Sequence, residues 1–387
     1  MISRTRLLLL MALVLGAVPA AAQTPGVSDT EIVIGGSNSF SGPLAFTGEH
    51  ITKYGVDLYF KVINDAGGIH GRKVRTVYYD DGYRPQDAVA NTKKLVEQDR
   101  IFAIIIPQGS PPVVATLDYL EEHKVPMLFP YQSSPVTRGK RWVLQGMTLS
   151  DRSSKMMIDY LAGQRKIKKF AALYQDDEYG KSFLTAFEKD LARHGLKLVA
   201  AESVKRGVND VSAQIAKLQA AKPEVTFLVL VPGPGAQALK ERQKIGWTDT
   251  LMVSTGPLTD ERYLALAGEA AEGVEGLSLW PDPVTSDLAG VKLYREHMQK
   301  YYPNTEVNRY SLAGYFAARL FTEGAKRAGR NLTRESLITA LESIKGWESG
   351  ILPPITIGPD HETQKQGFWV RVEMGRFKPI TDWLKSE

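Results

Sequence analysis

Short apolar runs alternate with amphipathic segments along most of the chain. The runs 101–106 and 225–231 are almost entirely apolar, which predicts strands of a parallel sheet that is covered on both faces. The segment 49–66 instead repeats its apolar residues at helical spacing, at Ile51, Tyr54, Leu58 and Val62. Such strand–helix repeats predict an α/β fold with parallel-rich sheets flanked by helices.

The same pattern sets the expected order of elements. It predicts strands at 32–34, 74–79, 101–106, 125–129, 170–174, 196–201, 225–231, 251–254 and 276–280. It predicts helices at 49–66, 85–98, 111–123, 151–162, 178–193, 210–221, 236–245, 287–302, 310–328 and 334–345, and a hairpin at 368–380. Because the rhythm restarts near residue 150, we expect two similar lobes.

The first 22 residues have the pattern of a secretory signal peptide. Arg4 and Arg6 precede an apolar stretch at 7–18, and the small residues at 20–22 form a cleavage site. After this stretch no run approaches the roughly 18 apolar residues that a membrane-spanning helix needs. We therefore expect a mature chain from residue 23 onward in the periplasm.

Composition excludes several kinds of site. The chain has no cysteine, so disulfides, cysteine-ligated metals and thiol nucleophiles are excluded. The six histidines show no metal-ligand spacing. The formal net charge is +5, but the basic residues are spread among the acids, and the stretch 165–169 reads as a solvated turn. We expect no metal, no cofactor and no nucleic-acid partner.

Enzyme motifs are weak. Residues 233–238 match G-x-G-x-x-A after a strand, the dinucleotide-binding pattern that a dehydrogenase would use. The next strand, however, ends at Ser254 without the acid that would hold the ribose of the cofactor. The acid pairs 80–81 and 176–177 follow strands, where they could hold a metal or, as we expect, cap loops and helices. A hydrolase that uses Ser110 or Ser133 remains an alternative, since a triad can assemble from distant residues. We expect a protein that is not an enzyme.

Two strand–helix junctions carry more information. The strand 101–106 ends in Pro107-Gln108-Gly109-Ser110-Pro111-Pro112, and the strand 125–129 ends in Pro130-Tyr131-Gln132-Ser133-Ser134-Pro135. Both place hydroxyl and amide groups at the carboxyl end of a strand, where open α/β sheets bind ligands. A helix N-terminus there favours a carboxylate, although the two prolines at 111–112 remove backbone donors.

An ordered set of motifs resembles a known family. Its members are Phe40-Ser41-Gly42-Pro43, Asn64-Asp65-Ala66-Gly67-Gly68-Ile69, Tyr79-Asp80-Asp81, Asp177-Glu178-Tyr179-Gly180 and Gly268-Glu269-Ala270-Ala271-Glu272-Gly273. Together with the two serine junctions, the set is similar to periplasmic substrate-binding proteins of branched-chain amino acid ABC transporters. The resemblance implies a type I periplasmic binding fold, with two lobes joined by a three-strand hinge. The implied lobes are 23–148 plus 278–360 and 149–277 plus 361–387.

The resemblance also implies a ligand site between the lobes. Ser110 and Ser133 match the hydroxyls that hold the ligand carboxylate, and Tyr179 matches a tyrosine that covers the ligand from the second lobe. The other implied contacts are Phe46, Thr47, Gln108, Gly109, Tyr131, Gln132, Pro232, Gly233 and Gly256. The implied partners are a small-molecule ligand and an inner-membrane ABC permease, and the implied state is a monomer.

One departure from the family bears on the ligand. Amino-acid-binding members resemble one another in a carboxylate near the position of Gly256, whereas this chain has Ser254-Thr255-Gly256-Pro257. Burying an ammonium group without an anion is strongly unfavourable. We therefore expect an organic acid without an α-amino group, with an aromatic carboxylate favoured. A branched-chain or other amino acid, an amide, or a sensing role for the same fold remains the alternative.

Overall fold

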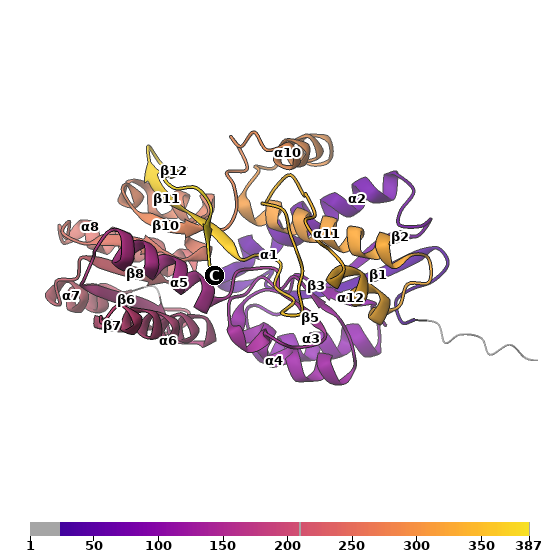
Figure 1. The fold of residues 1–387 in the computed structure, drawn as a ribbon, viewed down its shortest axis with the longest axis horizontal. Helices are drawn as coiled ribbons and strands as arrows, with labels where there is room; N and C mark the ends of the chain where they lie inside the picture. The colour runs from indigo at the N-terminus through magenta and orange to yellow at the C-terminus, as the bar shows by residue number, and fades with distance from the viewer. Residues whose placement is uncertain (1–23, 209, 387) are drawn as a thin grey trace, which may run out of the picture.

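Two parallel-rich sheets, each flanked by helices, form two lobes (Figure 1). The computed structural model describes residues 24–208 and 210–386, so the expected signal peptide lies outside the described residues. Within these ranges, no helix combines the length and the apolar character that crossing a bilayer requires.

The first sheet has the order β2-β1-β3-β4-β5, and all its strands are parallel. Its strands are β1 (Glu31–Asn38), β2 (Lys73–Asp80), β3 (Ala103–Ile105), β4 (Met127–Leu128) and β5 (Val143–Leu144). This sheet is flanked by four helices that alternate with its strands, α1 (Ala45–Ile51), α2 (Asp57–Asp65), α3 (Pro85–Glu97) and α4 (Ser110–Glu122). It is also flanked by α11 (Arg309–Ala328), from a later part of the chain. The carboxyl ends of β3 and β4 therefore lie side by side, as the two serine junctions require.

The second sheet has the order β12-β11-β10-β9-β8-β6-β7. Its parallel strands are β6 (Phe170–Gln175), β7 (Leu198–Val204), β8 (Val225–Val229), β9 (Leu251–Ser254) and β10 (Glu275–Ser278). The tail adds β11 (Gln366–Glu373) and β12 (Arg376–Pro379) in antiparallel sense, and β13 (Leu384–Lys385) pairs with β11. The helices of this lobe are α5 (Ser150–Ile158), α6 (Glu178–Arg193), α7 (Ser212–Ala220), α8 (Pro232–Lys244) and α9 (Glu261–Ala267).

The chain returns to the first lobe after β10. Helices α10 (Ala289–Tyr301), α11 and α12 (Arg334–Glu342) form this return, and α11 packs against α1 and α2. The segments that connect the lobes are hydrogen-bonded to one another: Gln145 N donates to His361 O at 2.9 Å, and Thr148 Oγ1 donates to Gln364 O at 3.2 Å. The expected two-lobed α/β architecture is thus confirmed.

Most differences from the predicted elements occur at element ends. The predicted strand 225–231 ends at Val229, because Pro232 already occupies the first turn of α8, four residues before the predicted start. The predicted helix 49–66 begins at Ala45 and contains a π-helical turn at Thr52–Val56. The pattern missed the two-residue strands β5 and β13 and the short helix α9, which are too short to show a period.

Candidate functional site

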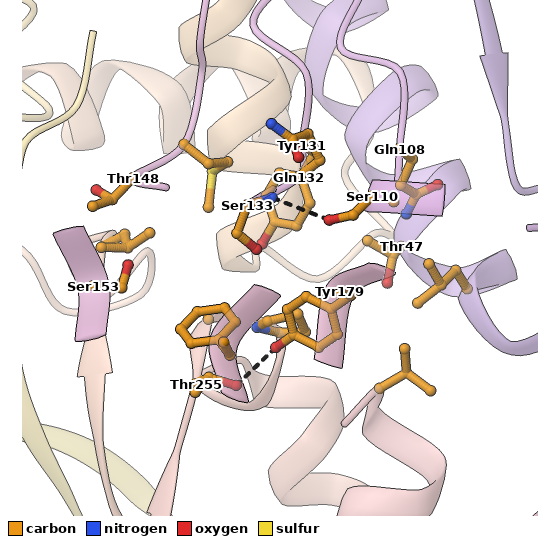
Figure 2. A pocket seen from close by; sticks show the side chains of 18 of the residues that line it. Thr47, Gln108, Ser110, Tyr131, Gln132, Ser133, Thr148, Ser153, Tyr179 and Thr255 are labelled. Carbon is orange, nitrogen blue, oxygen red and sulfur yellow. Dashed lines mark hydrogen bonds between the residues drawn. The ribbon is translucent and has the colours of Figure 1, made fainter. Parts of the chain in front are cut away.

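A cavity lies between the two lobes, at the carboxyl ends of β3 and β4. Most of the predicted site residues line it: Thr47, Gln108, Gly109, Ser110, Tyr131, Gln132, Ser133, Tyr179 and Gly256. Figure 2 shows Ser110, Tyr131 and Ser133 close together near its centre. These nine predicted residues come from both lobes and line the same cavity.

Backbone pairing brings the two serine junctions into register. Gly109 N donates to Tyr131 O at 3.0 Å, and Tyr131 N donates to Pro107 O at 2.8 Å. The Ser133 N–H donates to Ser110 Oγ at 3.3 Å. Gly109 has a φ of 85°, and a Cβ there would lie 2.2 Å from the Tyr83 ring, so the turn before α4 requires glycine.

Several hydrogen-bond donors at this end of the cavity have no partner among the described residues. Gln108 Oε1 accepts the Ser39 N–H at 3.3 Å, whereas its Nε2 is buried and unpaired. The hydroxyls of Tyr131 and Ser133 line the cavity, and neither forms a side-chain hydrogen bond within the described protein. These groups can donate to a ligand oxygen without giving up an existing bond.

The second lobe presents an acceptor instead. Thr255 Oγ1 donates to Leu228 O at 2.9 Å, so the 2.7 Å contact between Tyr179 and Thr255 is a bond that Tyr179 donates. The Tyr179 oxygen has then used its proton and can only accept a hydrogen bond from a ligand. Local backbone fixes this tyrosine: Asp177 caps α6 by accepting the Tyr179 N–H at 3.0 Å, and a Cβ on Gly180 would lie 1.9 Å from Gln175 O.

Three predicted residues lie outside the cavity lining. The ring of Phe46 stacks on His50, with centroids 3.8 Å apart, and the neighbouring Leu44 and Thr47 line the cavity in its place. Consecutive helical residues point about 100° apart, and here Thr47 faces the cavity while Phe46 turns toward His50. Pro232 and Gly233 form the start of α8, and only the preceding Val231 lines the cavity.

Sequence reasoning missed the residues that give the cavity its apolar walls. Tyr310 comes from the first turn of α11, and its ring lies 5.9 Å from that of Tyr131, edge to face. The other missed lining residues are Leu44, Tyr83, Met147, Thr148, Ser153, Met157, Phe183, Val231, Thr255, Pro257, Leu277 and Leu279. The periodic core pattern marks many of them as buried, but nothing in it separates a buried residue from one that faces a cavity.

The cavity has no charged side chain. Among the described residues that line it, none is Asp, Glu, Lys, Arg or His. Asp260, the first acid after Gly256, is buried at the start of α9 and is not part of the lining. Burial, followed by repulsion from Glu261, raises the pKa of Asp260 well above its usual range, which favours its neutral form.

The acid pairs at the strand ends hold loops and helices, as predicted. Asp80 accepts the N–H groups of Phe40 and Gly82 at 2.8 Å each. Asp81 accepts from the hydroxyls of Ser37 and Ser39. Over the part of the chain that the structure describes, no group of three or more His, Asp or Glu side chains is placed to hold a metal ion.

Contacts across the cleft show that the lobes are closed on each other. The Tyr83 hydroxyl donates to Asp177 Oδ2 at 3.2 Å, and Arg206 Nη1 donates to Tyr83 O at 2.7 Å. Further along the cleft, the Tyr310 hydroxyl donates to Pro257 O at 3.0 Å. We call Tyr83, Asp177 and Arg206 the cleft latch.

Comparison with known proteins places the chain in a family. The sequence model of a family described as periplasmic binding protein matches residues 31–376. The chain is 27% identical over 324 residues to the Leu/Ile/Val-binding protein homolog 3 of Brucella melitensis, covering 83% of this chain and 86% of that one.

Two solved structures share the fold. One is a fatty acid ABC transporter substrate-binding protein from Thermomonospora curvata, with a TM-score of 0.86, 25% identity, and coverage of 94% and 95% of the two chains. The other is an ABC transporter solute-binding protein from R. palustris in complex with benzoate, with a TM-score of 0.81, 19% identity, and coverage of 92% and 98%. The chain therefore belongs to the periplasmic binding protein family, as a two-lobed solute-binding component of an ABC transporter of the branched-chain amino acid type.

Proposed function

We propose that the cavity binds a small organic acid that lacks an α-amino group, with an aromatic carboxylate as the favoured class. The observation that carries this proposal is the absence of any charged side chain from the described cavity lining. An ammonium group enclosed there would have no anion to pair with, and its desolvation would oppose binding by several kcal/mol. A carboxylate needs only donors, which this lining supplies.

The donors all come from the first lobe, at the ends of β3 and β4. The hydroxyls of Ser110, Tyr131 and Ser133 and the unpaired Gln108 Nε2 can all serve a carboxylate. Hydrogen bonds to a charged acceptor contribute about 1.5–3 kcal/mol each. The N-terminus of α4 adds the favourable end of its dipole. The apolar body of the ligand then lies against methionine, leucine and aromatic side chains.

Transport follows from closure around this ligand. We propose that residues 23–148 plus 278–360 and 149–277 plus 361–387 move as the two lobes. A ligand that contacts both Ser110 and Tyr179 favours the closed form by its additional contacts there. The closed monomer then docks on an inner-membrane permease and releases the acid for uptake.

A neutral amide or hydroxy acid is the second candidate. The Tyr179 oxygen acts as an acceptor because its proton is used by Thr255. A neutral N–H or O–H group on the ligand could donate a hydrogen bond to the Tyr179 oxygen without bringing a charge into the cavity. The same site would then exclude the α-ammonium group for the reason given above.

Matched ligand pairs test the proposal directly. We expect 3-phenylpropionate and 4-methylpentanoate to raise the thermal midpoint of purified residues 23–387, and we expect phenylalanine and leucine, which add only the amino group, to leave it unchanged. A ligand at 100 times its Kd adds about 2.7 kcal/mol to the unfolding free energy. A higher midpoint with leucine or phenylalanine than with the matching acid would contradict the proposal. The Ser110→Ala variant should weaken binding of the acid roughly 10- to 100-fold, whereas Ser343→Ala, outside the cavity, should not.

The cleft latch provides a separate prediction. The Tyr83→Phe variant loses the hydroxyl that bonds Asp177 across the cleft, so the closed form is destabilised while the carboxylate donors are untouched. We expect roughly a tenfold loss of ligand affinity, caused by faster dissociation. Stopped-flow fluorescence measures both rate constants. An unchanged dissociation rate would show that this contact does not hold the closed lobes together.

A further inference from the structure

The cavity has a second polar position, separate from the carboxylate donors. Ser153 and Thr148 lie at one side of the lining, and Gln108 and Thr47 lie at the opposite side, with Ser110 and Ser133 between them (Figure 2). The cavity also has an apolar wall, to which Met147, Met157, Phe183, Leu277 and Leu279 contribute. A ligand held by its carboxylate at the donors would extend toward this wall.

Ser153 occupies this wall through the geometry of α5. It lies one turn before Met157 on the same face, and both side chains line the cavity. The adjacent Ser154 faces the other way and donates to Asp190. Position 153 therefore presents a hydroxyl group, and not an alkyl group, to the cavity.

The hydroxyl of Ser153 has no hydrogen-bond partner among the described residues. The residue is only 5% exposed, and its Oγ forms no hydrogen bond within the described protein. Hydroxyls in other helices donate to a carbonyl of the preceding turn, as Thr116 does to Val113 O at 2.9 Å and Thr322 to Ala318 O at 2.8 Å. Ser153 makes no such bond, so its hydroxyl is available to the cavity.

An entirely apolar ligand would leave this hydroxyl without any partner. Filling the cavity removes the water that could otherwise reach Ser153, and a buried polar group without a hydrogen bond opposes binding. A ligand with a hydrogen-bonding substituent at its far end avoids this penalty. Thr148 is less suited to the role because its hydroxyl already donates to Gln364 O at 3.2 Å.

We propose that Ser153 determines specificity, by hydrogen-bonding a hydroxyl substituent at the end of the ligand opposite its carboxylate. This inference rests on the proposed function and narrows it to hydroxylated acids. Ser110 and Ser133 hold one end of the ligand, the apolar wall contacts its body, and Ser153 recognises the other end. Recognition at two ends also fixes the length of the ligand, because a shorter acid reaches only one of them.

Calorimetric titration of one ligand series tests the assignment. The series is 3-phenylpropionate with its 3- and 4-hydroxyphenyl analogues, titrated into the wild-type chain and into Ser153→Ala. We expect at least one hydroxylated acid to bind the wild type about tenfold more tightly than the unsubstituted acid. We expect Ser153→Ala to abolish this preference and to bind 3-phenylpropionate at least as tightly as the wild type does, because no hydroxyl is then left without a partner.

The outcomes separate this inference from the proposed function. If none of the three acids binds, the proposed function is wrong. If the acids bind but no hydroxylated acid is preferred, or if the preference survives in Ser153→Ala, the role of Ser153 is refuted while the carboxylate site stands. The Thr148→Val variant is the matched control, because it removes the neighbouring hydroxyl from the same end of the cavity. A preference abolished by Thr148→Val and kept by Ser153→Ala would assign recognition to Thr148 instead.

Discussion

The Gly314→Ala variant is expected to lose about 3 kcal/mol of stability. Helix α11 crosses the π-helical turn at Thr52–Val56 so closely that a Cβ on Gly314 would lie 1.9 Å from Ile51 O and 3.1 Å from the Gly55 Cα. Both obstacles are backbone, so no side chain can move to make room. The helices must separate, and inserting even one carbon into a packed interface costs about 1–3 kcal/mol or more. Thermal unfolding should show a midpoint lowered by about 5 °C.

Gly163→Ala is the matched control for this prediction. Gly163 is also helical, but a Cβ there would meet only the His194 Cε1, at an ordinary 3.5 Å. Alanine is the better helix former, by up to about 1 kcal/mol. We expect this variant to match or slightly exceed the wild type. Equal midpoints for the two variants would mean that α11 can shift away from its neighbour without loss, and that the close crossing is not needed for stability.

The same crossing bears on the ligand site. Tyr310 lies in the first turn of α11, and Thr47 lies in α1, and both line the cavity. The distance between these two helices therefore sets part of the width of the cavity. A variant that separates them should weaken ligand binding as well as folding.

The turns that carry Ser110 and Ser133 could be predicted because the pattern that marks each of them is local in the sequence. Strand, turn and helix start are adjacent in the chain around Ser110 and again around Ser133, and parallel pairing of β3 with β4 brings the two turns together. Gly109 and Gln108 followed from the same turn. No long-range information was needed for these contacts.

Other parts of the site depend on long-range packing or on exact helical phase. Tyr310 reaches the cavity from a helix that follows the parallel strands of both sheets in the chain, and it is buried like any core tyrosine. Phe46 and Thr47 are both predicted ligand contacts, but only Thr47 lines the cavity, because consecutive helical side chains point about 100° apart. Ser153 belongs to a predicted helix, but only the tertiary structure shows that its face of α5 lines the cavity.

The hinge region holds the second large effect that we expect. Glu362 is 1% exposed at its side chain and lies in the last segment that joins the lobes. It accepts from Arg138 Nε at 2.7 Å and also pairs with Arg152 Nε. Arg138 precedes β5 in the first sheet, whereas Arg152 belongs to α5. One buried carboxylate therefore ties together groups on both sides of the hinge.

Glu362→Ala should destabilise the protein by about 3 kcal/mol. Removing one partner of a buried ion pair costs about 3–5 kcal/mol, because the remaining charge stays desolvated. The two arginine side chains are 33% and 24% exposed, and Arg138 keeps its two bonds to Asp151. The lower end of that range therefore applies. Denaturant unfolding measures the change, and Glu362→Gln should lose less, since its amide oxygen can still accept from one arginine.

The exposed pair between Glu49 and Lys53 is the matched control for this charge. Its atoms lie 3.3 Å apart, but the side chains are about half exposed, at 49% and 52%, and such a pair contributes about 0.3–0.5 kcal/mol. Glu49→Ala should therefore be nearly neutral, and salt should weaken the Glu49 contribution more than that of Glu362. If Glu362→Ala proves as mild as Glu49→Ala, the hinge is held by its backbone hydrogen bonds alone. If it is severe, the buried carboxylate stabilises the segments that join the two lobes.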